Sequence, residues 1–224
     1  MRVIHKTVTT ATYEKLKADI SAGKYKPGDH LLLKQLSEDL QVSRTPIRDA
    51  LIRLQEEGLV EAKPHRGMYV RKLKEKDISN YYQTRAVLEG LGAKLAAENI
   101  KQEETQVLED FINRMEKVLI HREDQGDEAI IKLNNSLHDY IFKIADNEVL
   151  DRLRRTLASP IALIRATSWI DSERKYEVFK EHEKLIIEII AKNPERAKEA
   201  AENHIHKAWE SANRNLKKLP EEED

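Results

Sequence analysis

Three histidines and one asparagine lie on apolar helical faces in the C-terminal half of the chain. Asn134 and His138 are four residues apart and share one such face. His182 continues an apolar stripe of a later helix, and His204 lies within an alanine-rich stripe that leaves room for a cavity. Because an unpaired buried polar group is costly, these side chains need partners. They are either hydrogen-bonded core residues or the ligands of a divalent metal such as zinc, nickel, copper or manganese.

Arg85 is expected to point towards the same core. Arg85 shares a helical face with Tyr81, Leu88 and Gly92. One interpretation is an ion pair with Glu89, four residues further along the helix. The other is a cationic clamp that holds a carboxylate ligand through the two-pronged guanidinium group. The pattern leaves both interpretations open.

A second pair of arginines stands at the start of a helix in the N-terminal part. Arg44 and Arg48 are four residues apart and avoid the apolar stripe of Ile47, Leu51 and Leu54. Arginine at the leading end of a helix can grip phosphates or read guanine through O6 and N7. The alternative is an amphipathic helix with ordinary surface arginines. Arg66, in a predicted hairpin tip, could reach an adjacent groove or the backbone of DNA.

The elements around these arginines predict a winged helix-turn-helix over residues 1–72. Thr9 or Thr10 can cap a first helix, which "SAGKYKPGD" ends. A second short helix follows, and Ser43 and Gly58 bound a third. The alternating runs "LVEAK" and "GMYVRKL", joined by "PHRG", predict a two-stranded wing. In this architecture the third helix enters the major groove of DNA.

The remainder of the chain is predicted to be helical. A charged linker spans residues 73–77, an all-helical domain spans 78–217, to which the resemblance described below assigns ligand binding and dimerisation, and an acidic tail spans 218–224. We find no strand pattern and no glycine-rich phosphate loop. The fold class is therefore mainly α, with an antiparallel bundle after the winged domain. Its six predicted helices span 75–99, 102–123, 126–144, 147–168, 171–191 and 194–217.

The charge distribution separates the two parts. Residues 1–72 hold 14 Lys and Arg against 9 Asp and Glu, a balance of +5, whereas the remainder holds 25 against 31, a balance of −6. A basic N-terminal part is typical of a polyanion-binding domain. The chain has no cysteine, which excludes disulfides and thiolate metal sites. No apolar run approaches the ~20 residues of a membrane span, so we expect a cytoplasmic protein without a membrane partner.

The N-terminal part resembles a known family. The segment "KPGDHLLLKQLSEDLQVSRTPIRDALIRLQEEGLVEAKPHRGMYV" is similar to the DNA-binding domain of GntR-type bacterial regulators, with a close match over residues 10–71. Lys34 stands where this family often has arginine, so its contact is expected to be a point charge on phosphate. The resemblance implies DNA contacts from Lys34, Ser43, Arg44, Thr45, Arg48, His65, Arg66 and Gly67.

Residues 75–217 resemble the FCD ligand-binding domain of the FadR subgroup, and the six-helix count is more similar to the VanR-type branch. The family motif implies metal ligation by Asn134, His138, His182 and His204. Zinc is the first choice, with nickel or manganese as alternatives. Asn134 replaces the commoner aspartate, and this neutral ligand should weaken metal binding. The resemblance also implies a small organic or sugar acid as effector at or near the metal, and Arg85 is our candidate to bind it.

Together these features predict a homodimeric transcription regulator of a double-stranded DNA operator, with repression relieved by an acidic metabolite as the expected mode. One alternative is a metal-dependent enzyme with an accessory DNA-binding domain. Glu181 and Glu183 flank His182 and are expected to point away from the histidines, which argues against catalysis. The other alternative is a constitutive DNA-binding dimer whose histidines are hydrogen-bonded in the core.

Overall fold

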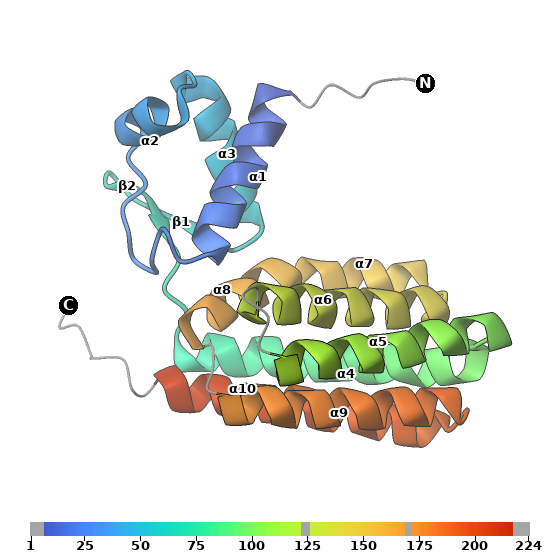
Figure 1. The fold of residues 1–224 in the computed structure, drawn as a ribbon. Coiled ribbons are helices and arrows are strands. Elements are labelled where there is room, and N and C mark those ends of the chain that lie inside the picture. Colours follow the sequence, from blue (N-terminus) through green and yellow to red (C-terminus); the bar gives the residue numbers. More distant parts are fainter. Residues whose placement is uncertain (1–6, 122–125, 169–171, 217–224) are drawn as a thin grey trace, which may run out of the picture. The chain divides into compact units, whose positions relative to one another are not determined.

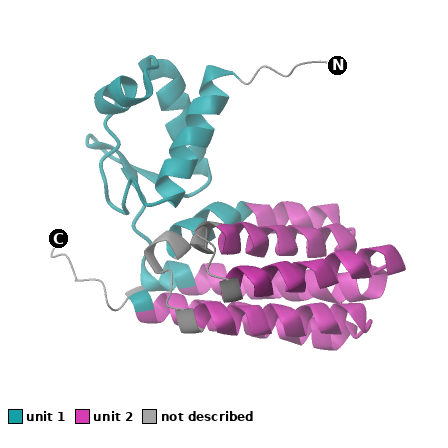
Figure 2. Ribbon diagram, viewed as in Figure 1, with its two compact units in different colours: residues 1–78, 156–168, 215–224 teal, residues 79–155, 169–214 magenta. Residues whose placement is uncertain are grey.

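Ten helices and a two-stranded sheet make up the described part of the chain (Figure 1), which confirms the mainly α fold class. The computed structural model describes residues 7–121, 126–168 and 172–216. The predicted acidic tail at 218–224 lies outside these ranges. The chain divides into two compact units, residues 1–78 with 156–168 and 215–224, and residues 79–155 with 169–214 (Figure 2). The domain limits expected from the sequence remain a prediction.

The first unit contains the winged helix-turn-helix that the sequence predicts. Its helices are α1 (Val8–Ser21), α2 (Leu33–Leu40) and α3 (Arg44–Glu56), and its strands are β1 (Val60–Lys63) and β2 (Gly67–Val70). The cap of α1 was predicted wrongly. Thr7, in extended conformation, is the N-cap, and its Oγ1 accepts a hydrogen bond from the Thr10 backbone N–H at 3.1 Å. The helix begins earlier than predicted because this residue satisfies a free N–H of the first turn.

Helix α3 buries one face and exposes the other. Ile47, Leu51 and Leu54 are fully buried in the core of this unit, together with Leu16 and Ile20 of α1. Burial of one such side chain stabilises the fold by roughly 1.5–3 kcal/mol. Ser43 has the extended backbone of an N-cap, and Gly58 ends the helix at a φ of 74°. The apolar face therefore holds the helix on the core, while its leading end stays on the surface.

The wing is an antiparallel hairpin with a tight glycine-dependent turn. Val60 pairs with Val70 and Lys63 with Gly67. Gly67 has a φ of 100°, and a Cβ on it would lie 2.8 Å from Nε2 of His30. Tyr69 pairs with His30 in an isolated bridge, and their rings stack at a centroid distance of 4.4 Å. This support from the α1–α2 connection holds the hairpin in place.

The rest of the chain contains the helices α4 (Glu75–Asn99), α5 (Gln102–His121), α6 (Gly126–Ala145), α7 (Glu148–Thr156), α8 (Ala158–Ser168), α9 (Ser172–Ile190) and α10 (Pro194–Leu216). In the second unit α5 packs against α6 and α9. The core there is apolar and includes Ala96, Leu108, Leu137, Ile141 and Ile186. None of the described helices combines the length and apolar content that a membrane span requires.

One predicted helix, 147–168, is divided in two in the structure. Helix α7 ends at Thr156 and α8 begins at Ala158. Pro160 explains the break, because a proline ring clashes with the carbonyl four residues earlier, here that of Thr156. In the first turn of a new helix, the missing N–H of proline costs nothing. From 75 onwards the described residues thus form seven helices, so the six-helix count behind the resemblance to the VanR-type branch was wrong.

Candidate functional site

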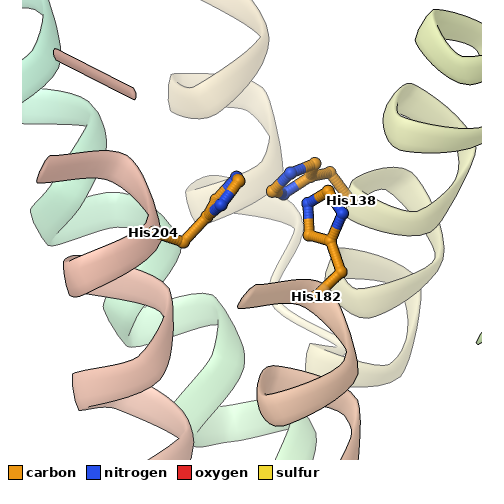
Figure 3. A group of neighbouring side chains, drawn as sticks. All are labelled: His138, His182 and His204. Carbon is orange, nitrogen blue, oxygen red and sulfur yellow. The ribbon is translucent and has the colours of Figure 1, made fainter. Parts of the chain in front are cut away.

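Three histidines from three helices meet in the core of the second unit (Figure 3). His138 comes from α6, His182 from α9 and His204 from α10. One ring nitrogen of each lies within 4.8 Å of one ring nitrogen of the other two. Their exposed fractions are 4%, 1% and 4%. The structure therefore brings together the three imidazoles that the sequence predicts to face inward.

Several nitrogens of this cluster lack hydrogen bonds. Within the described ranges, Nε2 of His138 and both ring nitrogens of His182 are buried and have no partner. Each such atom costs roughly 1–3 kcal/mol if it stays unpaired. Three imidazoles arranged in this way fit a divalent cation that accepts nitrogen ligands, such as zinc. The donor set therefore matches the metal interpretation better than that of hydrogen-bonded core histidines.

Two carboxylates lie against the outer nitrogens of the cluster. Oε2 of Glu89 is 2.9 Å from Nδ1 of His138, and Oε2 of Glu181 is 2.8 Å from Nδ1 of His204. The prediction that Glu181 points away from the histidines was wrong. Glu181 is turned by about 100° from His182 along α9, and this direction leads to His204 on α10. Arg174, seven residues earlier on the same helical face, donates to both oxygens of Glu181, and this spacing is the only hint of the contact in the sequence.

Burial keeps His182 and His204 neutral. Burial lowers the pKa of His182 well below its usual value, and nearby positive charge lowers it further. Burial also lowers the pKa of His204 to about 4, although its bond to Glu181 opposes this. Burial would raise the pKa of Glu181, but hydrogen bonds from His204 and Arg174 outweigh this and lower it to about 2. Neutral imidazoles beside ionised carboxylates are the protonation states that metal binding requires.

We expect the metal-free protein to lose stability as the pH falls from about 7 to about 5. The unfolded chain binds protons at His182 and His204 near pH 6.5, whereas the folded chain does not bind them until far lower pH. For His204, whose pKa is lowered to about 4, the loss is on the order of 2 kcal/mol by pH 5. Glu89 and Glu181 have lowered pKa values, so their protonation reduces stability only below about pH 4.5, outside this window. Urea denaturation with a chelator at each pH measures the effect.

The matched control is His206→Gln, because His206 is an exposed histidine on α10, the helix that also carries His204. This variant should keep the wild-type slope of unfolding free energy against pH, whereas His182→Gln should have a shallower slope. Equal slopes in all three proteins would contradict the assignment of the pH dependence to the cluster.

Arg85 and Asn134 are both buried beside this cluster. Nε of Arg85 donates to Oε1 of Glu89 at 3.3 Å, so the predicted ion pair is formed. The positive charge of Arg85 also lowers the pKa of His182 and His204. Asn134 lies one turn before His138, and its Nδ2 donates to Asn135 at 3.3 Å. Its Oδ1 is therefore available as an acceptor.

The residues proposed to contact DNA are all exposed on the first unit. Arg44 and Arg48 lie at the leading end of α3 and make no intramolecular ion pair with any described residue. By contrast, the guanidinium of Arg53 lies 3.9 Å from the ring centre of Tyr13. The charges at the leading end are thus free for an external anion. The full exposed set is Lys34, Ser43, Arg44, Thr45, Arg48, His65, Arg66 and Gly67.

Comparison with known proteins gives matches over both parts of the chain. Residues 8–70 match the model of bacterial regulatory proteins of the gntR family, and residues 80–207 match the FCD domain. The HTH-type transcriptional regulator YdhC of Bacillus subtilis (strain 168) is 32% identical over 193 residues, which cover 86% of this chain and 84% of YdhC.

Two further proteins from Escherichia coli are similar. The HTH-type transcriptional repressor RspR of strain K12 is 26% identical over 204 residues, with 91% of this chain and 88% of RspR covered. The solved structure of McbR/YncC superposes with a TM-score of 0.78 at 21% identity and covers 95% of this chain and 100% of that one. At this identity, the structural match supports the fold alone.

Proposed function

Because this chain belongs to the GntR family of bacterial regulatory proteins and carries an FCD domain, we propose that its binding to an operator is controlled by a small carboxylate held beside a metal ion. The chain is a DNA-binding transcription regulator and not an enzyme. The observation that carries the proposal is the buried cluster of His138, His182 and His204 with its unpaired nitrogens.

The DNA-binding half of the proposal rests on the leading end of α3. Arg44 and Arg48 project from the same helical face and lack intramolecular ion pairs among the described residues. Arg66 and His65 stand in the exposed turn of the wing, and Lys34 is exposed on α2. A homodimer would place two such helices in successive major grooves, about 34 Å apart along a near-palindromic operator.

The homodimer is supported by apolar side chains exposed on the second unit. Val87 and Leu91 are neighbours on α4, and Val149 and Leu153 are neighbours on α7, each pair one helical turn apart. Val87 is 65% exposed and Val149 is 56% exposed. A second copy of the chain that packed on these helices would cover both pairs.

The metal half of the proposal assigns His138, His182, His204 and the Oδ1 of Asn134 as ligands of one divalent cation, with zinc as the first choice. When bound, such an ion acts as a Lewis acid that attracts carboxylate oxygens. The proposed ligands are neutral, and the charged groups around them balance: Arg85, Arg174 and Lys207 against Glu89, Glu181 and Glu177. A divalent cation would therefore leave a net positive charge of about two, which favours an anionic effector.

Arg85 is proposed to bind this effector. Among the described residues it donates only through Nε, to Glu89, so both Nη groups remain available as the fork that a carboxylate accepts. By analogy with RspR, which is described as a repressor, we propose that the effector releases the protein from its operator. It can do so only by binding the released arrangement more tightly.

We expect small carboxylates to stabilise the zinc-loaded protein in a thermal-shift panel of mono-, di- and tricarboxylic acids and sugar acids. An acid at about 100 times its Kd should add about 2.7 kcal/mol to the unfolding free energy. The Arg85→Lys variant keeps the charge but loses the fork, so its response should fall severalfold.

The uncharged amides of the same acids serve as controls and should give no shift. Release of operator DNA by the stabilising acid, measured by gel shift, connects the pocket to DNA binding. A zinc-loaded protein that ignores every acid in the panel would leave a constitutive DNA-binding dimer as the better description.

A further inference from the structure

The histidine cluster is flanked by two arrangements of the same composition. On one side, Arg85 donates through Nε to Oε1 of Glu89 at 3.3 Å, and Oε2 of Glu89 is 2.9 Å from Nδ1 of His138. On the other side, the two Nη groups of Arg174 donate to the two oxygens of Glu181 at 2.5 and 3.1 Å. Oε2 of Glu181 is then 2.8 Å from Nδ1 of His204. Each is an arginine–glutamate–histidine chain.

These contacts determine which ring nitrogen carries the proton. An ionised carboxylate only accepts hydrogen bonds, so the facing Nδ1 of His138 and of His204 must be the protonated nitrogen. A neutral imidazole protonated at Nδ1 has its lone pair on Nε2. Nε2 of His138 is buried and has no partner in the described part of the chain. The carboxylate therefore prepares that nitrogen as a ligand before any cation binds.

His182 differs from its two neighbours. Neither of its ring nitrogens has a hydrogen-bond partner among the described residues, and its exposed fraction is only 1%. No carboxylate sets its tautomer, so it can present either nitrogen. Among the three histidines, only His138 and His204 therefore have the ligand nitrogen fixed by a neighbouring carboxylate.

Each carboxylate also lies between its arginine and its histidine, so the negative end of each ion pair faces the imidazoles. Glu89 is 4% exposed, and the side chain of Glu181 is 9% exposed. Asn134, which occupies the remaining ligand position in the proposal, is neutral. A buried carboxylate one imidazole away from a cation makes that imidazole a stronger ligand. The carboxylate thus acts on the cation through the imidazole ring and does not coordinate it directly.

We propose that Glu89 and Glu181 are the positioning residues of the metal site, which set the tautomers of His138 and His204 and turn the negative end of each arginine–glutamate pair toward the imidazoles. This inference rests on the proposed metal site. Arg85 and Arg174 in turn hold the two carboxylates in place. In this arrangement Arg85 links the effector to the metal site. Its Nη groups would bind the effector, while its Nε holds Glu89, which contacts the proposed metal ligand His138.

The test compares Glu89→Gln and Glu181→Gln with the matched control Glu183→Gln. Glu183 also flanks His182, but its carboxylate pairs with Lys180 at 2.8 Å and not with a histidine. Zinc affinity is measured by competition with a chromogenic chelator. We expect each of the first two variants to bind zinc roughly 10- to 100-fold more weakly than wild type, and Glu183→Gln to bind as wild type does.

A second measurement reads the tautomers directly. Long-range ¹H–¹⁵N spectra of the metal-free wild-type protein should show His138 and His204 protonated at Nδ1. If Glu89 and Glu181 had only a structural role, this signal would persist in their glutamine variants. Loss of that signal at His138 alone is expected in Glu89→Gln, and at His204 alone in Glu181→Gln.

The outcomes separate the inference from the proposed function. If wild type binds no zinc, the proposed metal site fails. If wild type binds zinc and all three variants match it, the positioning role fails while the metal site stands. Protonation of both histidines at Nε2 in wild type overturns the inference, even if a variant does not fold.

Discussion

Replacing Arg44 and Arg48 together with alanine is expected to abolish sequence-specific DNA binding while the helical content stays unchanged. Both side chains are exposed at the leading end of α3 and make no intramolecular ion pair among the described residues. An arginine that reads guanine or grips phosphate contributes about 1–3 kcal/mol. The two together should therefore cost on the order of 2–6 kcal/mol, or roughly 30- to 20,000-fold in Kd.

The DNA for this measurement is a duplex selected from a random 30-base-pair library by the wild-type protein, with Kd measured by fluorescence anisotropy at one fixed salt concentration. Salt must be held constant because phosphate contacts make affinity strongly salt-dependent. The matched control is Arg196→Ala, an exposed arginine of α10 in the second unit. Circular dichroism establishes that the double variant is folded. Retention of the wild-type Kd by a folded double variant would refute the placement of α3 in the major groove.

His182→Ala is expected to abolish zinc binding at micromolar zinc. The ring of His182 has two unpaired nitrogens, and its centre lies 4.5 Å from that of His204 and 5.4 Å from that of His138. Loss of this central ligand should weaken binding by more than the roughly 10- to 100-fold that outer carboxylates account for. Metal analysis by mass spectrometry after dialysis against zinc gives the stoichiometry directly.

Thermal stability gives a second measure of the same variant. Zinc at about 100 times its Kd should stabilise the wild-type protein by about 2.7 kcal/mol, and this gain should vanish in His182→Ala. The metal-free stability of the variant should change much less, because the lost packing is offset by removal of two unpaired buried nitrogens. His206→Ala, on the exposed side of α10, should keep the full response to zinc. Equal zinc content in His182→Ala and wild type would exclude the site.

Local sequence patterns were sufficient for helix α3 and for the inward direction of the three histidines. The stripe of Ile47, Leu51 and Leu54, with Ser43 before it and Gly58 after it, determines where α3 begins and ends and leaves Arg44 and Arg48 outside. The same periodicity indicates that His138, His182 and His204 face inward. These features depend on the 3.6-residue repeat and on backbone hydrogen bonding within each segment, so the sequence alone carries them. The break before α8 was also encoded locally, in Pro160.

Only the tertiary structure decided which side chains meet. Periodicity shows that Glu181 and His182 point in different directions from α9. It does not show that Glu181 points toward α10 and His204. It likewise allows Arg85 to pair with Glu89, but does not show that Glu89 is shared with His138 on α6. Such contacts depend on which helices pack together and at what register, and this is determined by many distributed apolar contacts. The inward direction of the imidazoles could be predicted from the sequence, whereas the carboxylates that contact them could be identified only in the packed bundle.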